Sequence, residues 1–281
     1  MNNYQKITVK PITGALGAEI SNVDLSALED PTFDEIYTAF LEHQVIFFRD
    51  QTLTPGDQVA FAKRFGDIHF HPYLNGMDEH PEILEIVREP GDAYTFGSTW
   101  HSDQMFNPRP AKATMLYAKE TPPVGGDTLF ASMYLAHDGL SEGMRRMLSN
   151  VKTWNDGDRN RNGRASRYAN AKSMVGQMRD PGDLVTSAAH PLIRTHPETG
   201  RKGLYFGIHA QALEGFEDNE AKPLLHYLRD HSTRPEYTCR FRWKPGSLAI
   251  WDNRCVQHKA LSDYTERRHM HRVTIAGDEP F

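Results

Sequence analysis

A histidine and an aspartate two residues apart form the first candidate site, in the segment Gly97-Ser98-Thr99-Trp100-His101-Ser102-Asp103. In an extended chain, side chains at i and i+2 point to the same face, so His101 and Asp103 can offer an imidazole nitrogen and a carboxylate oxygen to one ion. His258 lies 155 residues further along and can supply a second imidazole. Two imidazoles and one carboxylate form the facial triad of non-haem Fe(II) oxygenases, which leaves adjacent positions open. A hydrogen-bonded structural histidine stays the alternative for His258.

Two other histidine clusters compete with this set. Asp67, His69 and His71 alternate onto one strand face, and His269 and His271 form a second HxH pair. Three ligands on one straight strand spread over about 13 Å at roughly 3.3 Å per residue, so they do not surround one ion without a sharp bend. The spacing therefore favours the split set, and we place His71 on the wall of the substrate pocket.

Two arginines four residues apart, Arg268 and Arg272, add chemistry that an isolated metal site does not explain. On an extended segment they share a face, and each planar guanidinium suits carboxylate or sulfonate oxygens. They enter the apolar run 273–276, where burial requires an anionic partner. Ordinary surface arginines would have the same spacing.

Short strands separated by turns must position these side chains. The strand-like runs are residues 7–12, 45–48, 83–87, 113–118, 128–131, 190–195, 203–206, 237–243, 247–251 and 272–276. Turn residues at 197–200 and 244–246 predict two hairpins. Helical patterns start near Pro31 and at Thr54, and cover 133–148 and 219–228. The pattern predicts a mainly β fold with helical additions, built as a sandwich or barrel.

Length and charge narrow the class of protein. We expect one domain over residues 1–281 that can bury a large core, because 38% of the residues are hydrophobic. The formal charge of −5 has the wrong sign for a nucleic-acid partner, and no apolar run is long enough to span a membrane. Without a secretory signal or a CxxC pair, we expect a cytoplasmic protein whose two cysteines are reduced and buried. The oligomeric state stays open, homo-oligomers included.

A polar insertion interrupts the strands. Residues 155–172 carry five basic side chains, at positions 159, 161, 164, 167 and 172, against two acidic ones at 156 and 158. We interpret the region near 155–186 as an insert or lid next to an anionic ligand. A solvated surface insertion is the alternative.

Four motifs together identify a family. They are WHSD at 100–103, GGDTLF at 125–130, WDNR followed by QH within 251–258, and RRHMHRVTIAGD at 267–278. In their order and spacing the chain closely resembles the TauD/TfdA group, the taurine dioxygenase family of Fe(II)- and 2-oxoglutarate-dependent dioxygenases. The resemblance implies a double-stranded β-helix core, related to the jelly roll and the cupins, with helical additions.

The resemblance also assigns roles to individual residues. It implies that His101, Asp103 and His258 bind Fe(II), and that Arg268 with Thr128 holds the distal carboxylate of the co-substrate 2-oxoglutarate. Arg272 would face the substrate anion, with His71 on the same side. Trp100 and the Asp252-Asn253 pair would support the site. Decarboxylation of 2-oxoglutarate to succinate and CO2 would accompany the use of O2 to hydroxylate a substrate.

The substrate expected from the resemblance is a small organic anion, such as a sulfonate, a sulfate ester, an aryloxyalkanoate or a similar carboxylate. The hydroxylated product could collapse to a carbonyl and a leaving group. Taurine itself is not expected, because Gly97 stands where taurine-specific members have an asparagine, and residues 206–209 also differ. We place Phe206 and Tyr94 beside the substrate.

Other readings of the same residues remain. Stable hydroxylation or desaturation of a larger, natural-product-like substrate would use the same iron site. Two histidines and one carboxylate also serve Zn²⁺ in hydrolases. A zinc hydrolase would leave Arg268 and Thr128 without a role. A metal-free binding or structural β protein is a third alternative.

Overall fold

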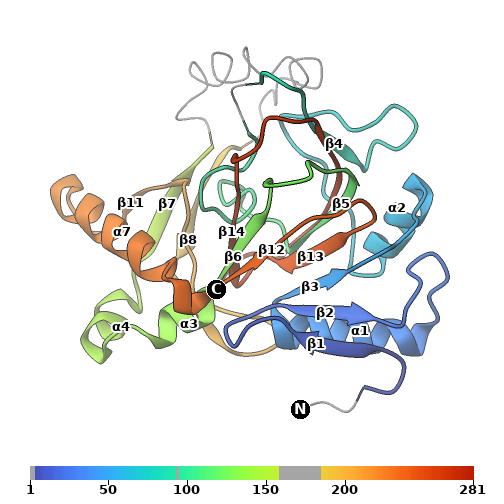
Figure 1. The fold of residues 1–281 in the computed structure, drawn as a ribbon. Helices are drawn as coiled ribbons and strands as arrows, with labels where there is room; N and C mark the ends of the chain where they lie inside the picture. The colour runs from blue at the N-terminus through green and yellow to red at the C-terminus, as the bar shows by residue number, and fades with distance from the viewer. Residues whose placement is uncertain (1–3, 93–94, 158–184) are drawn as a thin grey trace.

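Two β-sheets that face each other position the candidate residues (Figure 1). The computed structural model describes residues 4–92, 95–157 and 185–281. The larger sheet has the order β1 (Thr8–Pro11), β2 (Ala18–Ser21), β3 (Val45–Phe48), β13 (Leu248–Asp252), β5 (Ala113–Glu120), β15 (Arg268–Ile275) and β4 (Leu84–Arg88). The smaller sheet has the order β12 (Thr238–Phe241), β6 (Thr128–Ser132) and β14 (Val256–Ala260). Neighbouring strands of these two sheets run antiparallel, apart from β2 and β3.

Aromatic side chains join the facing surfaces of the two sheets. Phe47 of β3 stacks on Phe241 of β12 with ring centroids 4.0 Å apart, and Phe130 of β6 lies 5.5 Å from Trp251 of β13. All five residues of β13 are buried, because this strand lies in the middle of a sheet that is covered on both faces. The mainly β, jelly-roll-like core expected from the sequence is confirmed, as two open sheets rather than a closed barrel.

Helices α1 (Asp30–His43) and α2 (Pro55–Lys63) cover the other face of the larger sheet. Phe33, Ile36 and Phe40 form the buried stripe of α1, as the periodicity predicts. A capping box between Thr54 and Asp57 begins α2. Local sequence signals therefore set the buried face of α1 and the first residue of α2.

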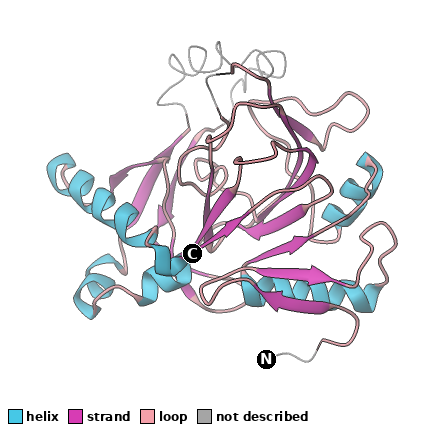
Figure 2. Cartoon of the chain, in the orientation of Figure 1, coloured by secondary structure: helices cyan, strands magenta, loops and turns pink. Residues whose placement is uncertain are grey.

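A third layer lies beside the smaller sheet. It contains the sheet β11 (Ala210–Leu213), β7 (Lys152–Asp156) and β8 (Ser187–Pro191), and the pair β9 (Ile193–Thr195) with β10 (Lys202–Leu204). Helices α3 (Met133–Asp138), α4 (Glu142–Leu148) and α7 (Asp218–Ser232) and the 3-10 turn η1 (Pro235–Tyr237) complete it. Figure 2 shows the helices around the outside and the strands in the middle. No helix of the described ranges has the length and apolarity needed to cross a membrane.

Several sequence expectations need correction. Strands β12 and β13 flank the turn at 244–246, but they belong to different sheets, so this turn is a crossover and not a hairpin. The turn at 197–200 does join the antiparallel pair β9 and β10. The expected helix over 133–148 is two helices, since α3 ends at Asp138, with Gly139 as its C-cap, and α4 begins at Glu142. Residues 155–156, placed in the insertion, end strand β7, and residues 158–184 lie outside the described part.

Candidate active site

The three residues of the split set meet between the two sheets. Ligand atoms of His101, Asp103 and His258 all lie within 4.8 Å of one another. Backbone pairing brings the two histidines together: the His101 N–H donates to the His258 carbonyl at 3.1 Å, and the His258 N–H donates to the His101 carbonyl at 2.8 Å. This bridge pairs His101 with β14 and explains how residues so far apart in sequence become neighbours. Asp67, His69 and His71 form no such cluster among the described residues.

Both imidazoles are held in a form that can bind a metal. The Nδ1–H of His101 donates to the carbonyl of Thr99 at 2.6 Å, which leaves the Nε2 lone pair directed toward Asp103, 3.6 Å from its Oδ1. Nε2 of His258 lies 3.9 Å from Oδ2 of the same carboxylate. Burial lowers the pKa of His101 and lowers that of His258 strongly, so both rings are neutral. Neutral imidazole is the form that coordinates metals.

Asp103 supplies the negative charge of the cluster. Burial opposes its ionisation, but the positive charge of Arg272 and the hydrogen bond from Thr114 lower its pKa below the ordinary value. Arg272 Nη2 lies 2.8 Å from Asp103 Oδ1. The cluster therefore combines two neutral nitrogens with one carboxylate, which is the donor set that Fe(II) takes in a facial triad.

A chain of hydrogen bonds fixes the carboxylate from behind. The hydroxyl of Thr114 donates to Asp103 Oδ2 at 2.6 Å, and Asn253 Nδ2 donates to the Thr114 oxygen at 3.0 Å. The indole N–H of Trp251 donates to Asn253 Oδ1 at 3.1 Å. Asn253 was expected as a support, whereas Thr114 was missed. Its only sequence signal is a hydroxyl inside a strand that is otherwise apolar over its first four residues.

Arg268 of β15 and Thr128 of β6 form a second set of buried polar side chains. Arg268 is 5% exposed, and its Nε and Nη2 have no hydrogen-bond partner. The indole of Trp243 donates to the Thr128 hydroxyl at 2.9 Å, and its ring lies 5.9 Å from the Arg268 guanidinium. Because the Thr128 oxygen accepts this bond, its own proton is available to an anion. A buried cation with unused donors beside a free hydroxyl fits a carboxylate, as expected for 2-oxoglutarate.

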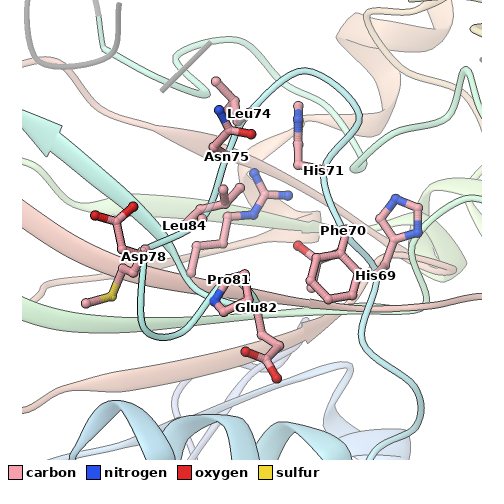
Figure 3. A pocket seen from close by; sticks show the side chains of 13 residues that line it. His69, Phe70, His71, Leu74, Asn75, Asp78, Pro81, Glu82 and Leu84 are labelled. Atoms are coloured by element: carbon pink, nitrogen blue, oxygen red, sulfur yellow. The ribbon is translucent and has the colours of Figure 1, made fainter. Parts of the chain in front are cut away.

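Arg272 reaches a cavity on its other side. A pocket of about 310 Å³ is lined by Arg272, Thr274 and the chain from His69 to Leu84, including His71. Figure 3 shows His71, Leu74 and Asn75 at one end of this pocket and Pro81 and Glu82 at the other. His71 and Arg272 thus line one cavity.

Two other predicted substrate residues, Phe206 and Gly97, do not line this cavity. Phe206 lies in the hydrophobic cluster that includes Met133 of α3 and Leu225 of α7, and it does not line the pocket. Gly97 has a left-handed φ of 75°, and a Cβ there would lie 3.2 Å from Cε1 of His101. Gly97 therefore lies next to the His101 ring, where a larger side chain would crowd the metal-ligand cluster. Tyr94 lies outside the described residues.

Comparison with known proteins supports the same chemistry. The family model described as "Taurine catabolism dioxygenase TauD, TfdA family" matches residues 8–274. An alpha-ketoglutarate-dependent sulfate ester dioxygenase of Pseudomonas putida is 34% identical, with 98% of this chain and 91% of the relative covered. An (S)-phenoxypropionate/alpha-ketoglutarate-dioxygenase of Sphingobium herbicidovorans is 32% identical, with 96% of this chain and 95% of the relative covered.

Solved structures show the same fold over nearly the whole chain. A taurine dioxygenase from Burkholderia xenovorans superposes with a TM-score of 0.83 at 33% identity, covering 98% of this chain and 91% of that structure. The structure of AAD-2 in complex with Mn(II) and N-oxalylglycine superposes with a TM-score of 0.78 at 28% identity, covering 98% of this chain and 99% of that structure.

Proposed function

The chain belongs to the TauD/TfdA family, and from this membership we propose that it uses iron held by His101, Asp103 and His258 to oxidise a small organic anion. It is a 2-oxoglutarate-dependent dioxygenase, like the relatives that match 96–98% of its length. The convergence of three metal-ligand groups together with a buried Arg268 that has two unused donor atoms is the observation that carries the iron assignment. A zinc hydrolase would have no use for the buried Arg268.

The chain's own residues would prepare the site for its metal and co-substrate. Bound Fe(II) supplies the chemistry that couples decarboxylation of 2-oxoglutarate to succinate and CO2 with the use of O2 to hydroxylate a C–H bond. Thr99 orients the His101 ring, and Thr114 orients the Asp103 carboxylate. Such outer contacts set the direction of the ligand lone pairs.

Arg268 and Thr128 would hold the far carboxylate of 2-oxoglutarate. The guanidinium offers two unused donors, and the Thr128 hydroxyl adds a third. Burial lowers the pKa of Arg268, but a guanidinium stays protonated in proteins, so the anion would pair with this buried charge.

Arg272 would bind the anionic group of the substrate. Its Nη2 contacts Asp103, while its Nε has no hydrogen-bond partner and the side chain lines the cavity that contains His71. Relatives named for sulfate esters, sulfonates and phenoxyalkanoates indicate the substrate class. Hydroxylation of the carbon that bears a sulfate or aryl ether oxygen gives an unstable product. Loss of the hydroxyl proton and cleavage of the bond to the leaving oxygen then yield a carbonyl and a free sulfate or phenol.

One experiment tests the assignment. Fe(II) and 2-oxoglutarate are added anaerobically to the purified protein, and the visible charge-transfer band of the chelate is recorded. Alkyl sulfates, alkylsulfonates, aryloxyalkanoates and taurine are then screened for a change in the band and for succinate formation in air. We expect a sulfate ester or an aryloxyalkanoate to give more succinate than taurine does. Absence of the band would contradict the iron site, and taurine as the best substrate would contradict the substrate class.

A further inference from the structure

A second set of two histidines and one carboxylate lies on the opposite side of strand β15. His269 and His271 alternate along this strand with Arg268 and Arg272, so the two pairs project to opposite faces of the sheet. Glu85 of β4 is paired with His271 in the strand register. Ligand atoms of Glu85, His269 and His271 all lie within 4.8 Å of one another. The dioxygenase site on the other face does not use these side chains.

The three donors already converge without an ion. Nε2 of His269 lies 3.0 Å from Glu85 Oε1, and the two imidazole rings have centroids 5.1 Å apart. Imidazole nitrogen and carboxylate oxygen together suit Zn²⁺, which takes three protein ligands and a water in an open tetrahedral site. Because the Glu85 and His269 side chains are partly exposed, a solvent ion has access and water can complete the coordination.

A buried amide supports His271 from behind. Gln58 of α2 is 1% exposed, and its amide nitrogen lies 3.3 Å from Nδ1 of His271. The two ends of a glutamine amide exchange places by a half-turn, so the amide oxygen can instead accept Nδ1–H. That arrangement directs the lone pair of Nε2 away from the helix, as in the outer contacts of metal-binding histidines.

From this geometry we propose that Glu85, His269 and His271 form a second divalent-cation site, suited to Zn²⁺. The ion would join β4 to β15 on the face behind Arg268 and Arg272. Lys119 of the neighbouring strand β5 adds positive charge near His271, which reduces affinity but leaves the three donors in place. Without a cation, His269 contacts Glu85 and His271 contacts Gln58.

Zn²⁺ binding to the full chain tests the proposal by stoichiometry. Equilibrium dialysis should give two Zn²⁺ per native chain, since the cluster at His101 also accepts Zn²⁺, and one per chain for Glu85→Gln and for His269→Ala. The Asp103→Ala chain should retain the second site. Gln58→Leu should weaken this site by about 10- to 100-fold while the first is unchanged.

A matched histidine provides the control. His226 lies 3.5 Å from Asp230 on the exposed face of α7, but this pair belongs to no three-ligand cluster among the described residues. His226→Ala should leave the stoichiometry at two. Circular dichroism in EDTA shows whether each variant folds, and Glu85→Gln changes only a partly exposed side chain. A stoichiometry that Glu85→Gln and His269→Ala leave unchanged overturns the proposal.

Discussion

The guanidinium of Arg272 lies 2.8 Å from the carboxylate of Asp103, with both side chains almost completely buried. This ion pair connects the metal-ligand cluster to the cavity that contains His71. A substrate anion bound by Arg272 would therefore be held beside the proposed iron. An anion bound to Arg272 would also change the electrostatic surroundings of the Asp103 carboxylate, because the two side chains are in contact.

Asp103→Ala should abolish iron binding and succinate formation, because it removes the carboxylate of the cluster. It also leaves Arg272 buried without its partner, which typically costs about 3–5 kcal/mol of stability. Iron titration and thermal unfolding measure the two effects. His69→Ala is the control and should retain iron. Loss of iron in His69→Ala with retention in Asp103→Ala would instead favour the local set of Asp67, His69 and His71.

Thr114→Val should weaken Fe(II) binding by about 10- to 100-fold while keeping the fold. The change preserves shape but removes the 2.6 Å hydrogen bond to Asp103 Oδ2. Fe(II) affinity, measured by anaerobic titration, is the readout, and Thr114→Ser should restore it. Thr153→Val is a matched control, because this buried threonine donates to the His190 carbonyl at 3.4 Å in another sheet. Equal iron affinity in Thr114→Val and the native chain would show that Thr114 is only a packing residue.

Arg268→Ala should raise the KM for 2-oxoglutarate strongly, since loss of a desolvated charge pair costs about 2–5 kcal/mol. Thr128→Val should have a smaller effect of about 1.5–3 kcal/mol, because it removes one hydrogen bond to a charged group. Steady-state succinate formation against 2-oxoglutarate concentration separates the two. If Arg268→Ala instead raises the KM for the main substrate and leaves the KM for 2-oxoglutarate unchanged, Arg268 binds the main substrate.

Gly97→Ala should reduce activity toward every substrate. The left-handed backbone at φ 75° costs a residue with a Cβ about 1–2 kcal/mol, and the new methyl group would lie 3.2 Å from the His101 ring. Iron affinity and turnover on the substrate panel test this. A change in substrate preference at constant iron affinity would show that Gly97 shapes the pocket rather than the metal cluster.

Local sequence patterns determined much of the fold and pointed to the candidate site residues. The apolar run 45–48 predicted β3, and the N-cap pattern at Thr54, followed by a proline, predicted the start of α2, because both signals depend on neighbours in the chain. The HxD spacing pointed to His101 and Asp103 because alternation in extended backbone is a local property. The motif order alone was enough to indicate the family and its β core.

Only the tertiary structure decided which distant segments meet. The bridge between His101 and His258, the hydroxyl of Thr114 behind Asp103 and the contact of Gly97 with His101 all join residues from separate segments or depend on backbone torsion. The turn at 244–246 gave the wrong pairing for the same reason, because a turn motif does not specify the sheet that each flanking strand joins. Strand partners are chosen by burial of both faces of each sheet, which is a property of the whole core.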